Sequence, residues 1–473
     1  MALYLFKSQR LITNLFKRNQ KVLLSLDSFT HHDHGSFSRN LRDLSSVCDD
    51  NPTLFRFQRL ESTKAQLQVD DTTQEEETSE GLNFPGGYVK FTSNMEFLPD
   101  SPEKRVHCYR ILDDNGDLIC DNFQKVDKEV ALKMYSDMVT LQVMDSIFYE
   151  AQRQGRISFY LTTNGEEAIN IASAAALNIS DYVFPQYREA GVLLWRGFSL
   201  QDFVNQCFGN KADNGKGRQM PIHYGSKKLN YFTVASTVAT QLIHAVGAAY
   251  GLKMEGRDSC TITYFGDGGT STADFHAALN FAAVKEVPII FFCRNNGWAI
   301  STPVEDQFRS DGIVVRGPAY GIRSIRVDGN DALAIYNAVS TARKMAISEQ
   351  RPILIEALTY RAGHHSTSDD STKYRSAEEI IWWRTAQDPV LKFRKWVERE
   401  GWWNDQAESE LKSNTRKQML HAIQVAEGLE KSPVKDIFSD VYDTPPLNLD
   451  EQELSLREAI RRYPDDYPSS VPC

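Results

Sequence analysis

Several features that mark other protein classes are missing from this chain of 473 residues. Positive charge is not in excess: the formal net charge is −10, which argues against nucleic acid as a partner. No apolar run approaches the length of about 20 residues that a membrane-spanning helix needs, so we expect no membrane partner. The seven cysteines are odd in number and form no CxxC pair. We therefore expect reduced, mostly buried thiols in a reducing compartment.

The first 26 residues lack any acidic side chain. They carry five basic residues and repeat Leu and Phe at helical spacing, which is typical of an organelle transit peptide. A basic tail without structure is the alternative, and a secretory signal fits less well because basic residues interrupt its apolar region. We expect 1–60 to be a mitochondrial transit peptide and variable leader, with a mitochondrion favoured over a plastid. The mature chain would then lie in the matrix.

The next segment, 61–83, is rich in acidic and poor in large apolar residues, which predicts a disordered linker. An irregular arm is expected at 84–127, with a short hairpin at Asn115-Gly116. Apolar residues at 3–4 residue spacing then predict a long helix from Lys128 to Gln154.

Short apolar segments alternate with helical patterns through the middle of the chain. This alternation predicts an α/β fold: a doubly wound, mostly parallel sheet flanked by helices. We place this domain at 128–376, followed by a tryptophan-rich helical C-terminal region at 377–473. The expected strands are Tyr182–Pro185, Thr261–Phe265, Pro288–Cys293, Ser324–Val327 and Ile353–Thr359.

Two polar clusters follow two of these strands: "GDGG" at 266–269, here called the GDGG turn, and "RNNG" at 294–297, the RNNG turn. Taken singly, each is an ordinary turn sequence. Residues 271–285 favour a helix, so strand, GDGG turn, helix, strand and RNNG turn form one βαβ unit. Both turns should then lie at the carboxyl edge of one sheet, where open α/β folds bind ligands.

The residues of the two turns suit a metal–diphosphate. Glycines let the backbone approach the ligand closely, and the following helix offers free N–H groups and a positive dipole end to phosphate. The Asp267 carboxylate and the Asn296 carbonyl are hard oxygen ligands for Mg²⁺. Arg294 adds positive charge for the phosphate.

Other phosphate-binding motifs are absent: the chain has no GxxxxGK[ST] sequence, and the GDGG turn is not GxGxxG, which argues against a P-loop and a nicotinamide site. Instead GDG, 26 residues and NN resemble the thiamine diphosphate fingerprint of the 2-oxo acid dehydrogenase and transketolase group. The segments "PQYREAGVLLWRG", "GNKADNGKGRQMPIHYG" and "TYRAGHHSTSDDSTKYRS" are similar to α subunits of branched-chain 2-oxo acid dehydrogenases, over roughly Phe84 to Pro446. Pyruvate dehydrogenase α subunits share the fingerprint, but "CRNNGWAISTP" and "GHHSTSDD" favour the branched-chain type.

This resemblance implies a thiamine diphosphate-binding fold and a 3-methyl-2-oxobutanoate dehydrogenase that transfers a 2-methylpropanoyl group. Such an enzyme decarboxylates branched-chain 2-oxo acids from valine, leucine and isoleucine and passes the acyl group to a lipoyl group of a transacylase core. The expected cofactors are thiamine diphosphate, Mg²⁺ and, at a second site, K⁺.

The resemblance also implies roles for single residues. His365 would be catalytic, donating a hydrogen bond or proton to the developing intermediate. Asp267 and Asn296 would ligate Mg²⁺ with the backbone carbonyl of Trp298; the family has Glu or Asp at position 267. The expected cofactor contacts are Tyr187, Arg188, Ser236, Val238, Gly268, Gly269, Arg294 and His365. The expected K⁺ site comprises Ala235, Thr237, Thr240 and Gln241, of which the first two replace the family's usual Ser and Pro.

Two side chains, Phe159 and Gln186, are expected to shape the pocket for the apolar tail of the substrate. Ser366 matches a regulatory phosphorylation position of the family, with Ser376 as a weaker second candidate, which implies a kinase and a phosphatase as partners. A phosphate at the mouth of the site would repel or reorder the loop. A plain polar loop is the alternative for both serines, and His364 is expected to be structural.

The carboxylate that activates the aminopyrimidine ring of the cofactor normally sits on a second α/β domain, for which this chain has no room. Glu166 and Glu167 are candidates within the chain, but they open a predicted helix and are expected to be structural. In the family a separate β subunit supplies this glutamate, which implies an α2β2 heterotetramer with the cofactor at the α–β interface.

Some residues depart from the family pattern. Thr272 and Ala273 replace Glu and Gly after the GDGG turn, and "QLIHAVG" lacks a proline. A catalytically weak paralogue with a structural or regulatory role therefore stays open, beside a pyruvate dehydrogenase α subunit and a protein that binds no cofactor.

Overall fold

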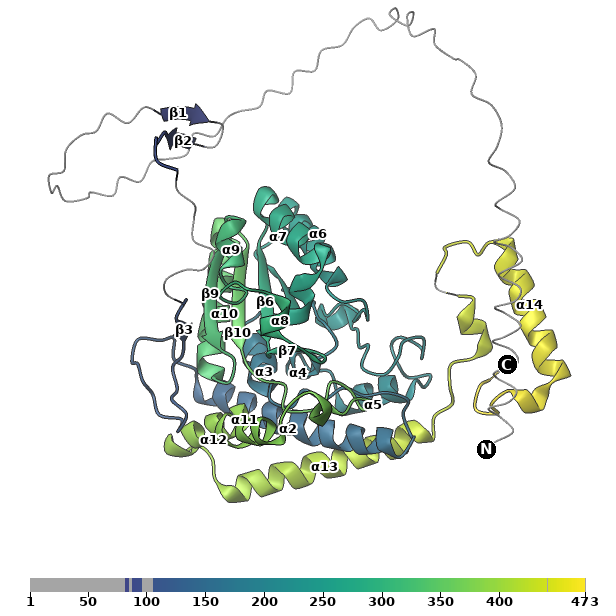
Figure 1. The fold of residues 1–473 in the computed structure, drawn as a ribbon. Helices are drawn as coiled ribbons and strands as arrows, with labels where there is room; N and C mark the ends of the chain where they lie inside the picture. Colours follow the sequence, from purple (N-terminus) through teal and green to yellow (C-terminus); the bar gives the residue numbers. More distant parts are fainter. Residues whose placement is uncertain (1–80, 85–86, 96–104, 440, 473) are drawn as a thin grey trace, which may run out of the picture. The chain divides into compact units, whose positions relative to one another are not determined.

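The computed structural model describes residues 81–84, 87–95, 105–439 and 441–472 (Figure 1). The predicted leader at 1–60 and most of the acidic linker at 61–83 lie outside the described residues. The chain divides into two units, and the first contributes only an antiparallel hairpin, β1 (Gly81–Phe84) with β2 (Gly87–Lys90). The second unit, from Met95 onward, holds every element considered below.

The second unit alternates strands and helices along the chain. Its strands are β3 (Cys108–Tyr109), β4 (Tyr182–Phe184), β5 (Thr261–Gly266), β6 (Ile289–Asn295), β7 (Trp298–Ala299), β8 (Thr302–Pro303), β9 (Arg323–Asp328) and β10 (Ile353–Leu358). Its helices are α2 (Lys128–Arg153), α3 (Glu167–Ala175), α4 (Ala190–Trp195), α5 (Leu200–Phe208), α6 (Thr240–Met254), α7 (Ala273–Lys285), α8 (Val304–Gln307), α9 (Arg316–Ala319), α10 (Ala332–Glu349), α11 (Ala377–Ala386), α12 (Pro389–Arg399), α13 (Asp405–Glu427) and α14 (Leu447–Arg462). A short 3-10 helix, η2 (Asp267–Ser271), lies between β5 and α7.

Six strands form one parallel sheet in the order β3-β9-β10-β6-β5-β4. Every residue of β6, at the middle of the sheet, is buried. Parallel sheets need cover on both faces, and alternate residues along a strand point to opposite faces. Accordingly Ile290 and Phe292 belong to one hydrophobic cluster, and Ile289, Phe291 and Cys293 belong to a second. The predicted doubly wound α/β fold is confirmed.

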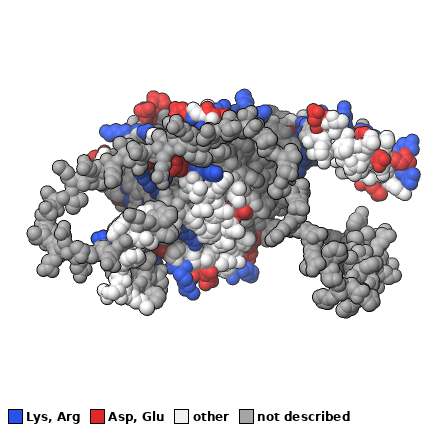
Figure 2. Space-filling model, turned by 90° about the horizontal axis from the view of Figure 1, so that it is seen from above, with Lys and Arg blue, Asp and Glu red and all other residues white. Residues whose placement is uncertain are grey.

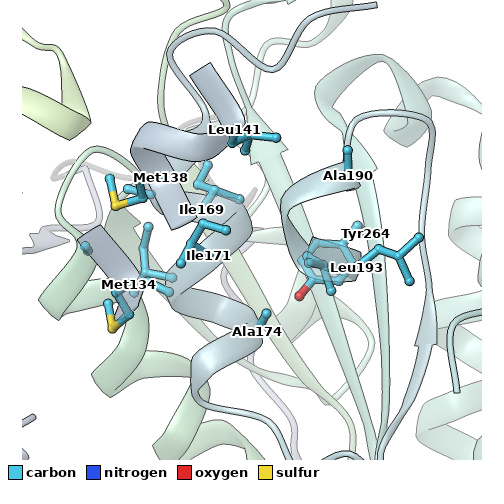
Figure 3. Packing of buried hydrophobic residues seen from close by; sticks show 14 of the residues in the cluster. Met134, Met138, Leu141, Ile169, Ile171, Ala174, Ala190, Leu193 and Tyr264 are labelled. Carbon is cyan, nitrogen blue, oxygen red and sulfur yellow. The ribbon is translucent and has the colours of Figure 1, made fainter. Parts of the chain in front are cut away.

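The two clusters correspond to two helical layers. Helices α6 and α7 supply eight of the 18 buried residues of the smaller cluster. The larger cluster contains side chains of α2, α3, α4 and α10 and extends to α12 and α13. Figure 3 shows its centre, where Met134 and Leu141 of α2 lie beside Ile169 of α3, with Leu193 of α4 and Tyr264 of β5 close by.

The absence of a side chain at Gly191 allows α4 to lie close to α2 and α3. A Cβ atom on Gly191 would lie 2.7 Å from Cβ of Asn170 and 2.8 Å from Cδ2 of Leu141. We expect Gly191→Ala to destabilise the protein by about 1–3 kcal/mol, because an overpacked core must shift side chains or backbone. Urea unfolding measures this. Gly247→Ala is the matched control, since a Cβ there meets nothing within 4 Å. A variant pair with equal unfolding midpoints would contradict the expectation.

The predicted strands agree with the structure to within two residues at each end, and the long predicted helix is α2. The expected hairpin at Asn115-Gly116 is a turn beside the antiparallel bridge of Leu112 with Leu118. Sequence analysis missed β3 and the small β7–β8 hairpin. Within the described part of the chain, no helix is both long and apolar enough to span a membrane.

The region expected to be helical, from 377 onward, contains α11 to α14. Helices α12 and α13 pack against α2. Helix α14 differs, because none of its residues is buried.

Candidate functional site

Both polar turns lie at the carboxyl edge of the sheet, as the sequence predicts. Strand β5 ends at Gly266 and β6 ends at Asn295, and Gly266 pairs with Arg294 in the parallel register. Strand β10 ends beside them, with Leu358 paired to Asn295. The loop after β10, which carries His365, therefore starts at the same edge.

The GDGG turn is in contact with the chain that follows the RNNG turn. A Cβ atom on Gly268 would lie 2.7 Å from Cβ of Ala299 in β7, so only glycine allows this approach. Gly269 is less constrained, because a Cβ atom there would meet its nearest heavy atom at 3.5 Å. Next in the chain, the Oγ1 atom of Thr272 accepts a hydrogen bond from the N–H of Phe275 and caps α7. The unusual Thr272 thus performs a local structural role.

Asp267 is a buried carboxylate that lies beside the side-chain amide of Gln307. It is 1% exposed, and its Oδ2 accepts a hydrogen bond from Nε2 of Gln307 at 2.7 Å. Burial raises the pKa of Asp267, and the Gln307 hydrogen bond and the Arg294 charge only partly oppose this. The Oε1 atom of Gln307 is buried without a hydrogen-bond partner among the described residues. An unsatisfied amide oxygen beside a desolvated carboxylate fits a bound cation.

The other two expected metal ligands lie within three residues of each other. The Oδ1 atom of Asn296 accepts a hydrogen bond from the N–H of Trp298 at 3.3 Å, and the Trp298 carbonyl accepts one from Arg361 at 3.4 Å. The described residues contain no group of three or more His, Cys, Asp or Glu side chains that could hold a metal. A carboxylate, an amide oxygen and a backbone carbonyl are few and hard ligands, which suits Mg²⁺ completed by phosphate oxygens.

Arg294 does not present a free cation to this site. It is 1% exposed, its Nε donates to Glu189, its Nη1 donates to Glu166 at 3.0 Å, and its Nη2 donates to Gln186 at 2.7 Å. Burial opposes the charge, but the two carboxylates outweigh burial and raise the pKa of Arg294 above its usual value. Its charge is therefore already compensated, which removes our reason for expecting it to neutralise phosphate directly.

His365 lies between two buried arginines. Arg188 donates to the His365 carbonyl at 2.7 Å, and its Nη2 is 3.3 Å from Nδ1 of the ring. Nη1 of Arg361 lies 3.5 Å from the same nitrogen, and Tyr187 contacts the ring edge-on with centroids 6.2 Å apart. Burial, then Arg188 and Arg361, lower the pKa of His365 to about 3. The imidazole is therefore neutral at physiological pH and can donate a hydrogen bond from one nitrogen.

The low pKa of His365 predicts acid sensitivity. The unfolded chain takes up a proton on this histidine below about pH 6.5, whereas the folded chain does not, so stability is lost as pH falls below that value. We expect His365→Gln, which cannot be protonated, to lose less stability than the wild-type protein between pH 6.5 and 5. Thermal unfolding midpoints across this range measure the difference. Parallel pH profiles for the two proteins would contradict the assignment.

The segment expected to hold K⁺ and to contact the cofactor leads into α6 and includes its first two residues, Thr240 and Gln241. Ala235, Ser236, Thr237 and Val238 are exposed, and Nε2 of His223 lies 2.5 Å from Oγ of Ser236. The Thr240 hydroxyl donates to the Thr237 carbonyl at 3.2 Å, and the Gln241 amide donates to the Tyr264 carbonyl at 2.8 Å. The structure thus brings Thr237 and Thr240 together, while the Gln241 amide is directed to β5.

The remaining predicted residues lie in separate surroundings. Gln186 is buried and bonds Arg294 of the RNNG turn, whereas Phe159 packs against the larger hydrophobic cluster. Oγ of Ser366 accepts a hydrogen bond from the N–H of Ser368 at 3.3 Å. The Ser376 hydroxyl accepts one from the N–H of Glu379 and caps α11. His364 binds Ser371, as expected for a structural histidine.

Sequence reasoning missed several side chains of the site. Glu189, Gln307 and Arg361 received no role, and Glu166 was expected to be structural, yet each binds a predicted site residue. Only Arg361 had a usable signal, because it comes three residues after β10 ends at the edge that holds the two turns.

Residues 135–435 of the chain match the family described as the dehydrogenase E1 component. The chain is 69% identical over 392 residues to 2-oxoisovalerate dehydrogenase subunit alpha 2, mitochondrial, of Arabidopsis thaliana, covering 83% of each chain. It is 58% identical over 471 residues, 99% of each chain, to subunit alpha 1, mitochondrial, of the same plant. The alpha subunit of Homo sapiens, also named mitochondrial, is 48% identical over 386 residues, 81% of this chain and 87% of the human one.

Proposed function

The chain belongs to the dehydrogenase E1 component family, and from this premise we propose that it is the α subunit of a mitochondrial branched-chain 2-oxo acid dehydrogenase. The family uses thiamine diphosphate. The reaction is the oxidative decarboxylation of acids such as 3-methyl-2-oxobutanoate. Carbon dioxide leaves, the acyl carbon is oxidised, and a lipoyl disulfide of a transacylase core is reduced as it takes the acyl group. We place the reaction in the mitochondrial matrix.

One observation carries the site assignment: the GDGG turn and the chain after the RNNG turn meet where Gly268 has no room for a side chain. The buried Asp267 carboxylate beside this contact would hold Mg²⁺ with Oδ1 of Asn296 and the Trp298 carbonyl. Bound thiamine diphosphate would supply the nucleophilic carbon and the electron sink that decarboxylation of a 2-oxo acid needs. The expected contacts of Tyr187, Arg188, Ser236, Val238, Gly269 and His365 remain part of this proposal, whereas that of Arg294 does not, because Glu166 and Glu189 already compensate its charge.

His365 has the chemistry that the reaction needs at the substrate. Burial, together with the flanking guanidinium groups of Arg188 and Arg361, keeps the imidazole uncharged, and Arg188 also bonds the His365 carbonyl. A neutral imidazole can donate a hydrogen bond to the substrate oxygen where negative charge develops.

A separate β subunit is the family partner, and it would supply the carboxylate that activates the cofactor. Exposed apolar side chains on α6 and α7 support a large protein partner: Ile243, Tyr250, Met254, Phe281 and Val284. Figure 2 looks down on the molecule from the top of Figure 1, where α6 and α7 lie, and shows a broad area with few charged side chains. We propose an α2β2 heterotetramer docked to a lipoyl-bearing transacylase core.

Three finer assignments complete the proposal. A K⁺ ion would be held near Thr237 and Thr240, where backbone and hydroxyl oxygens lie together, with Ala235 and Gln241 nearby. A kinase would phosphorylate Ser366, and less readily Ser376, whose hydroxyl is engaged as a helix cap. A phosphate on Ser366, next to His365, would repel the substrate carboxylate, and a phosphatase would restore activity. Phe159 and Gln186 are proposed to line the substrate pocket.

The test is turnover with the partner present. The full chain is co-expressed with a branched-chain β subunit, and CO₂ release from 3-methyl-2-oxobutanoate is measured with thiamine diphosphate, Mg²⁺ and an artificial electron acceptor. We expect turnover that requires the β subunit and exceeds the rate with pyruvate. A stable α–β complex without turnover would instead identify a structural paralogue. Faster turnover of pyruvate would identify a pyruvate dehydrogenase α subunit.

A further inference from the structure

Glu166 is the side chain that joins the metal ligand Asn296 to the buried arginine. It lies at the N-terminus of α3 and is fully buried. Its Oε1 accepts a hydrogen bond from Nδ2 of Asn296 at 2.7 Å, and its Oε2 accepts one from Nη1 of Arg294 at 3.0 Å. Both carboxylate oxygens are therefore in use, which leaves Glu166 unsuited to activate the cofactor ring.

The carboxylate determines which way the Asn296 amide faces. A carboxylate only accepts hydrogen bonds, so Asn296 must turn its NH₂ group toward Glu166 and its Oδ1 away. On that other side, the N–H of Trp298 is the one hydrogen-bond partner that the described residues supply to Oδ1, at a long 3.3 Å. Without Glu166, little would prevent the amide from exchanging its oxygen and nitrogen by a half turn.

We propose that Glu166 is a positioning residue that holds the Asn296 amide with its oxygen toward the metal ion. The inference rests on the proposed function, in which Asn296 is a Mg²⁺ ligand. The rest of the network is consistent with this role, because Arg294 is itself fixed by Glu189 and Gln186 and so anchors Glu166 from behind. Partners of this kind, one bond removed from the ion, typically change metal affinity about 10–100-fold when lost.

Glu166→Gln tests the orientation directly. Glutamine has one acceptor and one donor end, but Arg294 and the Asn296 NH₂ are both donors. The arrangement without a clash gives the Gln oxygen to Arg294 and the Gln NH₂ to the Asn296 oxygen, which requires Asn296 to flip. The flipped residue would present an NH₂ group to the ion. We expect Mn²⁺ affinity to fall at least about tenfold.

The measurement uses the α–β complex with saturating thiamine diphosphate and Mn²⁺ as the probe, with free Mn²⁺ quantified by electron paramagnetic resonance. Glu189→Gln is the matched control, since it removes a buried carboxylate from the same arginine without touching Asn296. We expect it to weaken Mn²⁺ binding less than Glu166→Gln does. Equal weakening would show that only the charge matters and would overturn the positioning role.

A paired exchange provides the second test. Glu166→Gln with Asn296→Asp keeps the number of carboxylates and restores a donor–acceptor pair between the two side chains. Aspartate offers an oxygen to the ion in either orientation, so Mn²⁺ affinity should return to within a few fold of wild type. If Glu166→Gln fails to assemble, this double variant carries the test, and its failure to bind Mn²⁺ once assembled would overturn the proposal.

Mn²⁺ binding by the wild-type complex distinguishes a failure of the proposed function from a failure of the role given to Glu166. If wild-type protein binds no Mn²⁺ with thiamine diphosphate, the proposed function fails and this inference fails with it. If wild type binds Mn²⁺ and Glu166→Gln binds it equally well, the proposed function stands and only the role of Glu166 is wrong.

Discussion

Replacing Asp267 with asparagine should lower the turnover of 3-methyl-2-oxobutanoate at least about a thousandfold, equivalent to about 4 kcal/mol of lost transition-state stabilisation. Asp267 is the only charged member of the proposed metal set, and the change keeps its shape while removing its charge. An asparagine oxygen attracts Mg²⁺ far less strongly than a desolvated carboxylate does. The assay is CO₂ release by the α–β complex at saturating thiamine diphosphate and Mg²⁺.

The same variant should separate metal binding from folding. Burial disfavours the Asp267 charge in the absence of metal, as its raised pKa indicates, so asparagine should leave metal-free stability unchanged or higher. Mg²⁺ with thiamine diphosphate should raise the unfolding temperature of wild type but not of the variant, because ligand stabilisation requires binding to the folded state. Asp306→Asn, the same change at an exposed position one residue before Gln307, is the control. Activity of Asp267→Asn above a tenth of wild type would contradict the metal role.

The sheet and its active edge could be predicted because the signals are local. Each buried strand is a short apolar run such as 289–293, and each turn follows its strand directly, so parallel pairing brings Gly266 beside Arg294 without further information. The missed β3 has only two residues and pairs with β9, more than two hundred positions later. A strand that depends on so distant a partner leaves almost no pattern in its own sequence.

The site was harder to predict than the sheet, since hydrogen-bond partners depend on tertiary distance. Arg294 follows a strand and looked like a phosphate ligand, but the two glutamates that neutralise it come from segments more than one hundred positions earlier. Glu166 opens α3 as predicted, and nothing in its local sequence points to Asn296. Charge and position after a strand therefore drew attention to Arg294 but left its hydrogen-bond partners open.

Replacing Arg294 with methionine should destabilise the protein by about 3–5 kcal/mol at neutral pH, the cost of leaving buried charges without a partner. Glu166 and Glu189 are both fully buried, and Arg294 bonds each of them. Methionine fills a similar volume, so the loss reports electrostatics and hydrogen bonding rather than a cavity. Chemical unfolding of the α chain and of the α–β complex measures it.

The stability loss caused by Arg294→Met should depend on pH in a definite direction. Burial raises the pKa of Glu189 in the folded protein, and loss of the Arg294 charge would raise it further, so the variant loses stability as pH rises and regains it as pH falls. The difference in free energy of unfolding between variant and wild type should therefore narrow from pH 7 to pH 5.

Adding Glu189→Gln to Arg294→Met should recover part of the lost stability, because it removes one of the two carboxylates left without a partner and the effects of residues in contact are not additive. Arg323→Met, which breaks an exposed pair with Glu349, should cost less than about 1 kcal/mol. If Arg294→Met cost no more than that control, the buried network would contribute nothing to folding, and the case for Glu166 as a firmly anchored support of Asn296 would fall with it.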